Sequence, residues 1–232
     1  MSLEHQQLQE RYKQVQQQIQ AICQHNQAQQ SVQLLAVSKT QPSQAIQTMY
    51  QFGQRCFGEN YLQEALDKIQ QLADLDIEWH FIGHIQRNKT KPLAENFAWV
   101  HGVERLLIAE RLSQQRPEHL APLNICLQVN IDNQDSKSGC AVAEVPDLVA
   151  SISQLAHIRL RGLMIIPQPN NMQAFSDAQQ LFNQVKQYHY HPEDWDTLSM
   201  GMSADLEYAI PAGSTMVRVG TALFGERDYS TQ

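Results

Sequence analysis

The sequence predicts a single (β/α)8 barrel of the TIM type, in the α/β class, preceded by an extra N-terminal helix. Three observations lead there: a length of 232 residues, eight short strand-like segments, and helical patterns between successive strands. Strands that alternate with helices pair in parallel through right-handed crossovers, and eight such units close into a barrel of about 250 residues. A doubly wound open sheet is the alternative, because it shows the same alternation.

The chain begins with a predicted helix over residues 3–28. Its apolar residues recur three or four positions apart, which places them on one face: Leu8, Tyr12, Val15, Ile19 and Ile22. A coiled-coil dimer is the alternative, but the pattern covers only about two heptads where a coiled coil needs three or four. We therefore expect this helix to pack on the body of its own chain.

The remaining elements alternate in order along the chain. The predicted strands cover 33–38, 55–58, 78–82, 98–101, 123–129, 159–165, 197–199 and 216–219. The predicted helices cover 43–52, 60–73, 87–96, 104–115, 145–155, 172–188 and 204–210. No linker, repeat or low-complexity tract divides them, so we expect residues 1–232 to form one domain.

Composition excludes several classes of function. The chain has 42% hydrophobic residues, a net charge of −7 and no basic block, so nucleic acid is not an expected partner. No apolar run is long enough to span a membrane, and residues 1–30 lack the apolar core of a signal peptide. The sequence therefore predicts a cytoplasmic protein, and nothing in it requires more than a monomer.

The four cysteines are far apart and form no Cys-x-x-Cys motif; they are Cys23, Cys56, Cys126 and Cys140. Reduced thiols are expected, with neither disulfides nor a zinc site. His80 and His84 are four residues apart, as in a metalloprotease helix, but they fall on and just after a predicted strand. We therefore predict no metal site.

Lys39 directly follows the first predicted strand. Side chains alternate along a strand, so Lys39 shares a face with Leu35 and Val37. If that face is the barrel interior, burial lowers the pKa of the lysine, and a neutral amine can attack an aldehyde to form a Schiff base. A lysine that extends to water is the alternative when this segment is taken alone.

In a barrel, functional residues gather at the C-terminal ends of the strands. Reading those ends in order gives Lys39, Glu59-Asn60, Gly83-His84, Asn130, Met164, Ser199 and Gly220-Thr221. Glycine-rich turns follow strands seven and eight, where barrels often bind a phosphate. Ser203 suits the N-cap of the next helix. Arg218 alternates with two valines, so it points inward and needs a partner, either a carboxylate or a ligand atom.

The chain resembles the pyridoxal phosphate homeostasis protein family over nearly its whole length. The shared motifs are Ala-Val-Ser-Lys-Thr at 36–40, Phe-Gly-Glu-Asn-Tyr at 57–61, Trp-His-Phe-Ile-Gly-His at 79–84, Ser-Lys-Ser-Gly at 136–139, Gly-Leu-Met at 162–164, Leu-Ser-Met-Gly-Met-Ser at 198–203, Gly-Ser-Thr-Met-Val-Arg-Val-Gly-Thr at 213–221 and Phe-Gly at 224–225. The sequence of the loop at 130–135 differs from the one that is usual in the family.

The resemblance implies a barrel similar to the N-terminal domain of alanine racemase, with pyridoxal 5′-phosphate held as a Schiff base (an aldimine) on Lys39. It implies that Ser199, Gly220 and Thr221 hold the phosphate and that Arg218 faces the pyridine nitrogen. It places three further residues near the ring: Asn60, Met164 and Met202. The implied role is storage, delivery or buffering of the cofactor, with effects on vitamin B6 and amino-acid metabolism and transient contact with apoenzymes.

A catalytic role is the competing hypothesis. An arginine at the pyridine nitrogen disfavours ring protonation and weakens the cofactor as an electron sink, which leaves proton exchange at Cα as the accessible chemistry. A racemase needs a second acid or base on the other face, such as Tyr61 or His84. The racemase's additional β-domain is not expected after strand eight, so a binding protein is the main prediction and an amino-acid racemase the alternative.

Two groups of basic residues are given secondary roles. Arg87, Lys89 and Lys91 are expected on a solvated helix face, with a weak anion site as the alternative. Lys137 is expected as a loop lysine at the cofactor end, and as the alternative it acts as a second amine during transfer.

Overall fold

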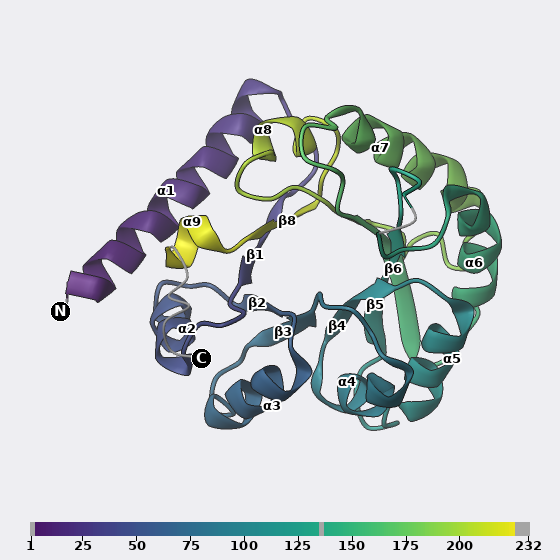
Figure 1. The fold of residues 1–232 in the computed structure, drawn as a ribbon, viewed down its shortest axis with the longest axis horizontal. Helices are drawn as coiled ribbons and strands as arrows, with labels where there is room; N and C mark the ends of the chain where they lie inside the picture. The colour runs from purple at the N-terminus through teal and green to yellow at the C-terminus, as the bar shows by residue number, and fades with distance from the viewer. Residues whose placement is uncertain (1–2, 135–136, 226–232) are drawn as a thin grey trace.

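The computed structural model describes residues 3–134 and 137–225 and shows a closed barrel of eight parallel strands in the order β1 to β8. Figure 1 looks along the barrel, with the strands around the centre and the helices outside. The predicted (β/α)8 barrel is confirmed, and the open sheet is excluded because β1 pairs with β8 as well as with β2. Ser136 of the Ser-Lys-Ser-Gly motif lies outside the described residues.

The strands agree with the predicted segments to within about two residues at each end, which is the usual uncertainty of an element boundary. They are β1 Gln33–Val37, β2 Cys56–Glu59, β3 Glu78–Phe81, β4 Trp99–Val103, β5 Leu123–Val129, β6 Ile158–Ile165, β7 Thr197–Ser199 and β8 Met216–Val219.

The helices that connect the strands are α2 Ser43–Gln51, α3 Leu62–Gln71, α4 Thr90–Asn96, α5 Leu106–Gln115, α6 Val145–Ile152, α7 Gln173–Val185 and α8 Leu206–Ala209. Three short 3-10 segments accompany them: η1 Arg87–Lys89, η2 Val142–Glu144 and η3 Lys186–Tyr188. A short helix that the sequence analysis did not anticipate, α9 Thr221–Phe224, follows β8 directly.

The N-terminal helix, α1 Leu3–His25, lies along the outside of the barrel beside α2, α8 and α9 (Figure 1). Four residues of the predicted stripe are buried, namely Leu8, Tyr12, Val15 and Ile19, and Ile22 packs partly buried against the same core. Arg11 donates a hydrogen bond to the carbonyl of Phe224 in α9. The prediction that this helix packs on its own chain is confirmed.

The large hydrophobic core lies between the strands and the surrounding helices. The barrel interior is different, because it holds two small apolar clusters, one around Leu35 and Met216 and the other around Trp99 and Met164. Buried polar residues share this interior, among them His80, His101, Ser199 and Arg218. A polar interior that opens at the strand ends is suited to binding a polar ligand.

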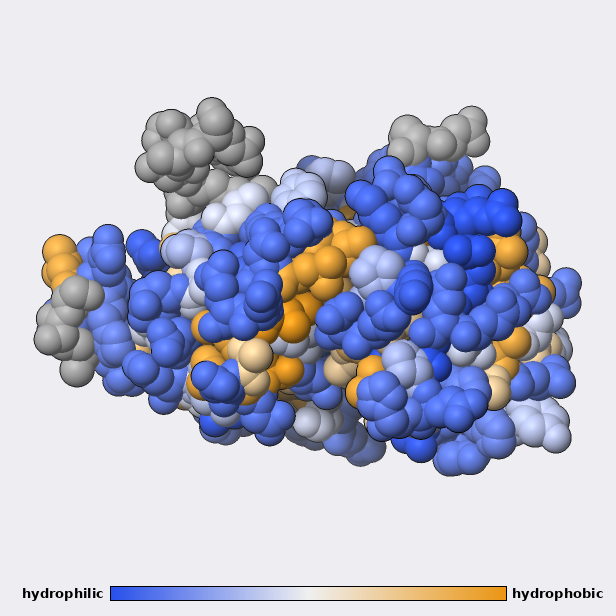
Figure 2. Space-filling view, turned by 90° about the horizontal axis from the view of Figure 1, so that it is seen from below, coloured by the Kyte–Doolittle hydropathy of each residue, from blue (hydrophilic) through white to orange (hydrophobic). Residues whose placement is uncertain are grey.

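The outer surface seen in Figure 2 is mainly hydrophilic, with hydrophobic groups gathered in smaller areas. Of the helices that the structure describes, none combines the length and apolarity that crossing a membrane requires. All four cysteines are free thiols, as the sequence analysis predicted.

Candidate functional site

A cavity of about 300 Å³ opens at the C-terminal ends of strands β1, β2, β3, β6, β7 and β8. Its wall is formed by Val37, Lys39, Asn60, Ile82, Ile166, Met202, Ser203, Ala204, Arg218, Gly220 and Thr221. Strand alternation explains the set, because each of these strands contributes an inward-facing position near its end or the loop that follows. Lys39 and Val37 share the wall, as their spacing predicted.

Six of the eight predicted site residues meet at this cavity: Lys39, Asn60, Met202, Arg218, Gly220 and Thr221. The other two, Met164 and Ser199, are fully buried, do not line it, and pair with each other in register between β6 and β7. They face the barrel interior one layer below the cavity. Ser199 therefore contacts the site through Arg218 and not directly.

The anchor candidate Lys39 is held by contacts of the residues on either side of it. Lys68 of α3 donates to the Ser38 carbonyl at 2.8 Å, and Glu64 of α3 accepts from the Thr40 backbone N–H at 2.6 Å. Thr40 adopts a left-handed conformation with φ of 64°. A main chain fixed on both sides of Lys39 limits the positions that its side chain can reach.

The same lysine of α3 belongs to a buried ion network. Lys68 forms ion pairs with Glu59 at 2.8 Å and Glu64 at 2.5 Å, and Glu59 also accepts from the Ser38 hydroxyl. Burial raises the pKa of Glu59, and the neighbouring Lys68 opposes that rise. This network lies behind Lys39, between β2 and α3, so it positions the lysine without entering the cavity.

Arg218 points inward, as the flanking valines predicted, and Val217 and Val219 belong to the outer core. Its guanidinium donates to the Ser199 carbonyl at 2.7 Å, the Ser199 hydroxyl at 2.8 Å and the Ile165 carbonyl at 2.8 Å. None of the ion pairs in the described part of the chain includes it. Burial lowers the pKa of Arg218 to about 10, so it remains a cation at neutral pH.

A row of hydrogen bonds continues from Arg218 through the barrel interior. The Ser199 hydroxyl lies 3.3 Å from Nδ1 of His101, Nε2 of His101 lies 2.9 Å from Nδ1 of His80, and Nε2 of His80 lies 3.0 Å from Oε1 of Glu78. Burial lowers the pKa of both imidazoles, and the hydrogen bond from His80 lowers the pKa of Glu78. Two neutral imidazoles and an ionised carboxylate leave one arrangement, in which every donor points from Arg218 toward Glu78.

Asn60 presents an unpaired acceptor at the cavity. Its Oδ1 atom is buried and has no hydrogen-bond partner among the described residues. An unpaired buried polar atom costs about 1–3 kcal/mol, which makes it a position where a ligand donor is expected. A ligand donor placed beside Asn60 would satisfy this oxygen, and Lys39 and Arg218 line the same cavity.

The two glycine-rich turns follow β7 and β8, and residues of both line the cavity. Gly201 has φ of 96°, and a Cβ there would come within 2.7 Å of Ala209 Cβ, so a glycine is required. Gly220 is the N-cap of α9, whose first N–H groups have no partner within the helix. The N-cap position of α8 is occupied by Asp205 and not by Ser203. The Asp205 carboxylate accepts from the Met202 N–H in the preceding loop, and Ser203 lines the cavity.

The remaining candidates lie away from the cavity wall. Tyr61 and His84 are exposed and do not line it. Arg87, Lys89 and Lys91 are exposed, as expected for a solvated face. Lys137 forms an ion pair with Asp132 at 2.8 Å and donates to the Ile166 carbonyl, so it reaches the rim.

Four cavity residues were not anticipated as part of the site, namely Ile82, Ile166, Ser203 and Ala204. Ile82 and Ile166 each directly follow a strand, so the strand-end rule could have found them. Ser203 and Ala204 lie in a loop after β7, whose course the sequence pattern does not define.

The chain is similar in sequence to proteins of known families. The chain matches the family described as alanine racemase, N-terminal domain, over residues 11–228. It is 56% identical over 200 residues to the pyridoxal phosphate homeostasis protein of Pseudomonas aeruginosa, and the match covers 86% of each chain.

Solved structures of related proteins have the same fold as this chain. PipY of Synechococcus elongatus is 36% identical, and the matches cover 94% of this chain and 100% of PipY, with TM-scores of 0.84 for the form without PLP and 0.81 for the form with PLP bound. An alanine racemase of Clostridium difficile shares the fold with a TM-score of 0.69 at 11% identity, over 85% of this chain and 53% of the racemase.

Proposed function

Because the chain belongs to the pyridoxal phosphate homeostasis protein family, within the alanine racemase N-terminal domain family, we infer that it binds pyridoxal 5′-phosphate and serves in the homeostasis of that cofactor. PipY, a structural relative, is described with PLP bound. The barrel with its cavity at the strand ends supports the same reading.

The residues of the cavity fit this cofactor in size and in chemistry. Among the residues that the structure describes, the wall of this cavity of about 300 Å³ offers Lys39 for an aldehyde and Arg218 as a cation for an anionic ligand, and it includes no carboxylate. The buried unpaired Oδ1 of Asn60 offers an acceptor for a ligand donor. The observation that carries the proposal is the convergence of Lys39, Arg218 and this unpaired oxygen on one cavity.

We propose separate roles for the residues around the cofactor. Pyridoxal phosphate supplies an aldehyde that condenses with a primary amine, and Lys39 is the amine in the cavity. Gly220 and Thr221 bind the phosphate through the start of α9, and Ser203 adds a hydroxyl from the opposite loop. Arg218 faces the pyridine nitrogen, while Asn60 and Met202 lie beside the ring.

Ser199 and Met164 support this site from below. Ser199 orients Arg218 by accepting two hydrogen bonds from its guanidinium, one at the carbonyl oxygen and one at the hydroxyl oxygen. Met164 packs with Trp99 and Cys126 in the barrel interior. We therefore propose that both residues position the residues of the cavity and that neither contacts the phosphate directly.

We propose that the protein is a carrier and not a racemase. A racemase needs a second proton-transferring group across the substrate from the lysine. Within residues 3–134 and 137–225, the cavity wall includes no histidine, tyrosine, cysteine or carboxylate, so neither Tyr61 nor His84 is part of it. Exchange of the Cα proton of L-alanine or L-serine for deuterium at about 1–10³ s⁻¹, the range of ordinary turnover numbers, would contradict the carrier.

We further propose that the carrier acts as a cytoplasmic monomer that passes the cofactor to apoenzymes in transient contacts. One chain supplies the whole cavity wall, and four free thiols suit a reducing compartment. Light scattering on the loaded protein tests the monomer: a mass near 26.5 kDa is expected, and twice that mass contradicts it.

The proposed anchor is tested by borohydride reduction followed by peptide mass mapping. We expect the purified protein to be yellow, to lose its visible band on reduction, and to carry a pyridoxyl group on Lys39. Lys39→Ala should abolish the adduct, whereas the control Lys91→Ala should retain it, because Lys91 is exposed and pairs with Glu95 on α4. An adduct at another lysine in wild-type protein would overturn the assignment.

A further inference from the structure

A cysteine, a carboxylate and an imidazole meet at the N-terminal end of the barrel, opposite the cofactor cavity. The ligand atoms of Cys56, Glu78 and His80 all lie within 4.8 Å of one another. Cys56 Sγ is 3.4 Å from Glu78 Oε1, and His80 Nε2 is 3.0 Å from that same oxygen. Nothing in the proposed handling of the cofactor uses this cluster.

The barrel register brings the three side chains together. Cys56 of β2 pairs with Glu78 of β3 in the parallel ladder, so their side chains lie next to each other on the inner face. His80 is two residues beyond Glu78 and therefore faces the same way. All three positions are thus fixed by strands, which hold a metal ligand more firmly than loops do.

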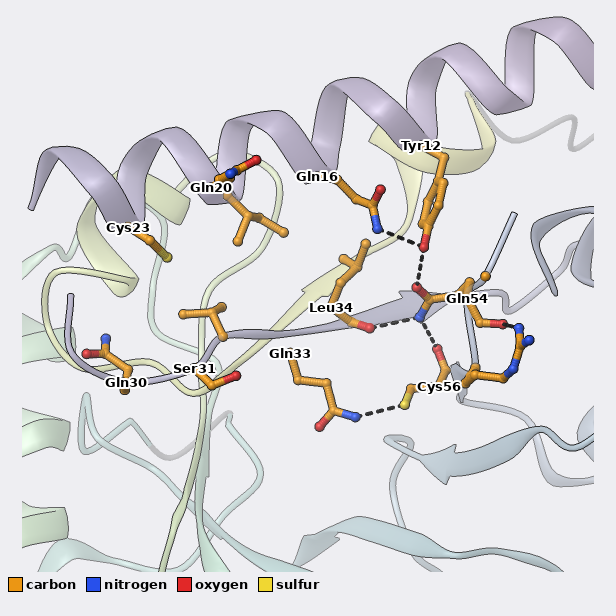
Figure 3. A pocket seen from close by; sticks show the side chains of 14 residues that line it. Tyr12, Gln16, Gln20, Cys23, Gln30, Ser31, Gln33, Leu34, Gln54 and Cys56 are labelled. Carbon is orange, nitrogen blue, oxygen red and sulfur yellow. Dashed lines mark hydrogen bonds between the residues drawn. The ribbon is translucent and has the colours of Figure 1, made fainter. Parts of the chain in front are cut away.

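Solvent reaches the cluster from a second cavity. This cavity of about 570 Å³ lies between α1 and the first two strands, and Cys56 and Gln33 line it (Figure 3). Figure 3 shows the Gln33 amide directed at the Cys56 sulfur, with which it forms a hydrogen bond of 2.8 Å. The Glu78 side chain is 40% exposed, so an ion has a path to the site.

We propose that Cys56, Glu78 and His80 form a zinc-binding site whose fourth ligand is water. Zinc takes sulfur at about 2.3 Å and nitrogen or oxygen at about 2.0–2.2 Å, so neighbouring ligand atoms in a tetrahedron lie roughly 3.3–3.6 Å apart. The sulfur–oxygen and nitrogen–oxygen distances are within a few tenths of an ångström of that spacing. Mg²⁺ and Ca²⁺ are disfavoured at this site, because both ions prefer ligands that are all oxygen atoms.

The surroundings of the cluster suit a metal ligand set. His80 contacts His101 through its other nitrogen at 2.9 Å, which is the second-shell partner that fixes the orientation of a ligating imidazole. The Gln33 N–H stabilises negative charge on the Cys56 sulfur. With no metal, burial and Glu78 raise the pKa of the Cys56 thiol to about 12, so the ion replaces a proton that the sulfur otherwise keeps.

Binding is a balanced exchange. Zinc forms bonds to Cys56 Sγ, Glu78 Oε1 and His80 Nε2, and the thiol proton leaves to solvent. The His80 proton moves from Nε2 to Nδ1, and His101 changes tautomer in step, with no change in the charge of either ring. One proton is therefore released for each zinc ion bound at neutral pH.

Zinc uptake by the full-length, cofactor-loaded protein tests the site. After chelator treatment, incubation with excess zinc and gel filtration, elemental analysis should give one zinc per chain. Cobalt in place of zinc should give a thiolate-to-cobalt charge-transfer band in the difference spectrum. Cys56→Ser should remove the band and weaken zinc binding by at least about 10–100-fold, the effect of losing even a second-shell partner.

Cys23→Ser is the matched control, because Cys23 lines the same cavity but lies outside the cluster. It should retain both the zinc and the band. Glu78→Gln, at a partly exposed side chain, should weaken zinc binding while leaving the cobalt–sulfur band in place at higher cobalt concentration. The proposal is overturned if wild-type protein takes up no more zinc than Cys56→Ser, or if Cys23→Ser removes the metal equally.

Discussion

At the C-terminal ends of the strands, single side chains carry the proposed chemistry, and the buried oxygen of Asn60 without a hydrogen-bond donor is one that indicates a ligand contact. Asn60 and Gln115 both hold a buried oxygen that lacks a donor among the described residues. Only Asn60 lines the cavity. The same defect should therefore have different consequences at the two positions, since a ligand can satisfy one oxygen and not the other.

Asn60→Ala should raise the dissociation constant for pyridoxal phosphate about fivefold to tenfold, the worth of one net hydrogen bond of about 1 kcal/mol. The unfolding free energy of the cofactor-free protein should change by no more than about 1 kcal/mol, because the oxygen has no bond to lose. Titration by absorbance and urea unfolding measure the two quantities. Gln115→Ala is the control and should bind as wild type; equal binding by Asn60→Ala contradicts the assigned contact.

Sequence reasoning predicted a set of side chains at the strand ends, and two of that set lie below the cavity for a common reason. Lys39, Arg218 and Gly220 line the cavity because strand alternation defines which face a residue occupies. Met164 and Ser199 also face inward, but they lie one layer deeper. Alternation predicts which face of the sheet a side chain occupies, but it does not predict how deep in the barrel the side chain lies. That depth depends on the stagger between neighbouring strands.

At the scale of elements, the contact between α3 and the end of β1 is what orders the Lys39 loop. Lys68 is 5% exposed and joins Glu59 of β2 to the carbonyl of Ser38. A buried pair of this kind is costly to break, because removing one partner leaves the other charge buried and uncompensated. Helix, strand and loop therefore depend on one another here.

Lys68→Met should lower the free energy of unfolding by about 3–5 kcal/mol, because Glu59 stays buried without its partner. It should also slow loading of the cofactor, since the loop around Lys39 loses an anchor. Urea unfolding and stopped-flow absorbance measure these effects. Adding Glu59→Gln should recover most of the lost stability, and a single variant as stable as wild type would show that the pair does not hold this loop.

The long elements were predictable, whereas of the two shortest helices α8 was predicted with wider bounds, over 204–210, and α9 was not anticipated. Strands and long helices follow from periodic apolar residues, and their bounds agreed closely with the pattern. The last two helices have only four residues each, too few to show a helical period. Their positions depend on tertiary contacts such as the close approach of Gly201 to Ala209, which the local sequence does not reveal.

For the molecule as a whole, α1 packs on the outside of the barrel and connects its first and last elements. It contacts elements from both halves of the chain, α2 near the first strand and α8 and α9 near the last. The helix thereby covers the side of the barrel where β1 and β8 close the ring (Figure 1). Its buried residues should contribute to the stability of the barrel, because they belong to the same hydrophobic core as the strands and the surrounding helices.

Ile19→Ala should reduce the free energy of unfolding by about 2–5 kcal/mol, as expected for a buried isoleucine that leaves a cavity. Leu3→Ala on the same helix should change it by less than about 0.5 kcal/mol, because Leu3 is 70% exposed. Urea unfolding of both variants compares them directly. Equal, small effects would mean that α1 is dispensable for the barrel.

The row of hydrogen bonds from Arg218 to Glu78 gives the barrel an electrical axis. Because each donor points the same way, the bond dipoles add, with the positive end beneath the cofactor cavity and the negative end at the opposite opening. A cation bound at Glu78 and His80 would reverse the proton between the two imidazoles and turn part of that axis around. The two openings of the barrel, separated by its whole interior, are therefore electrically connected through five side chains joined by four hydrogen bonds.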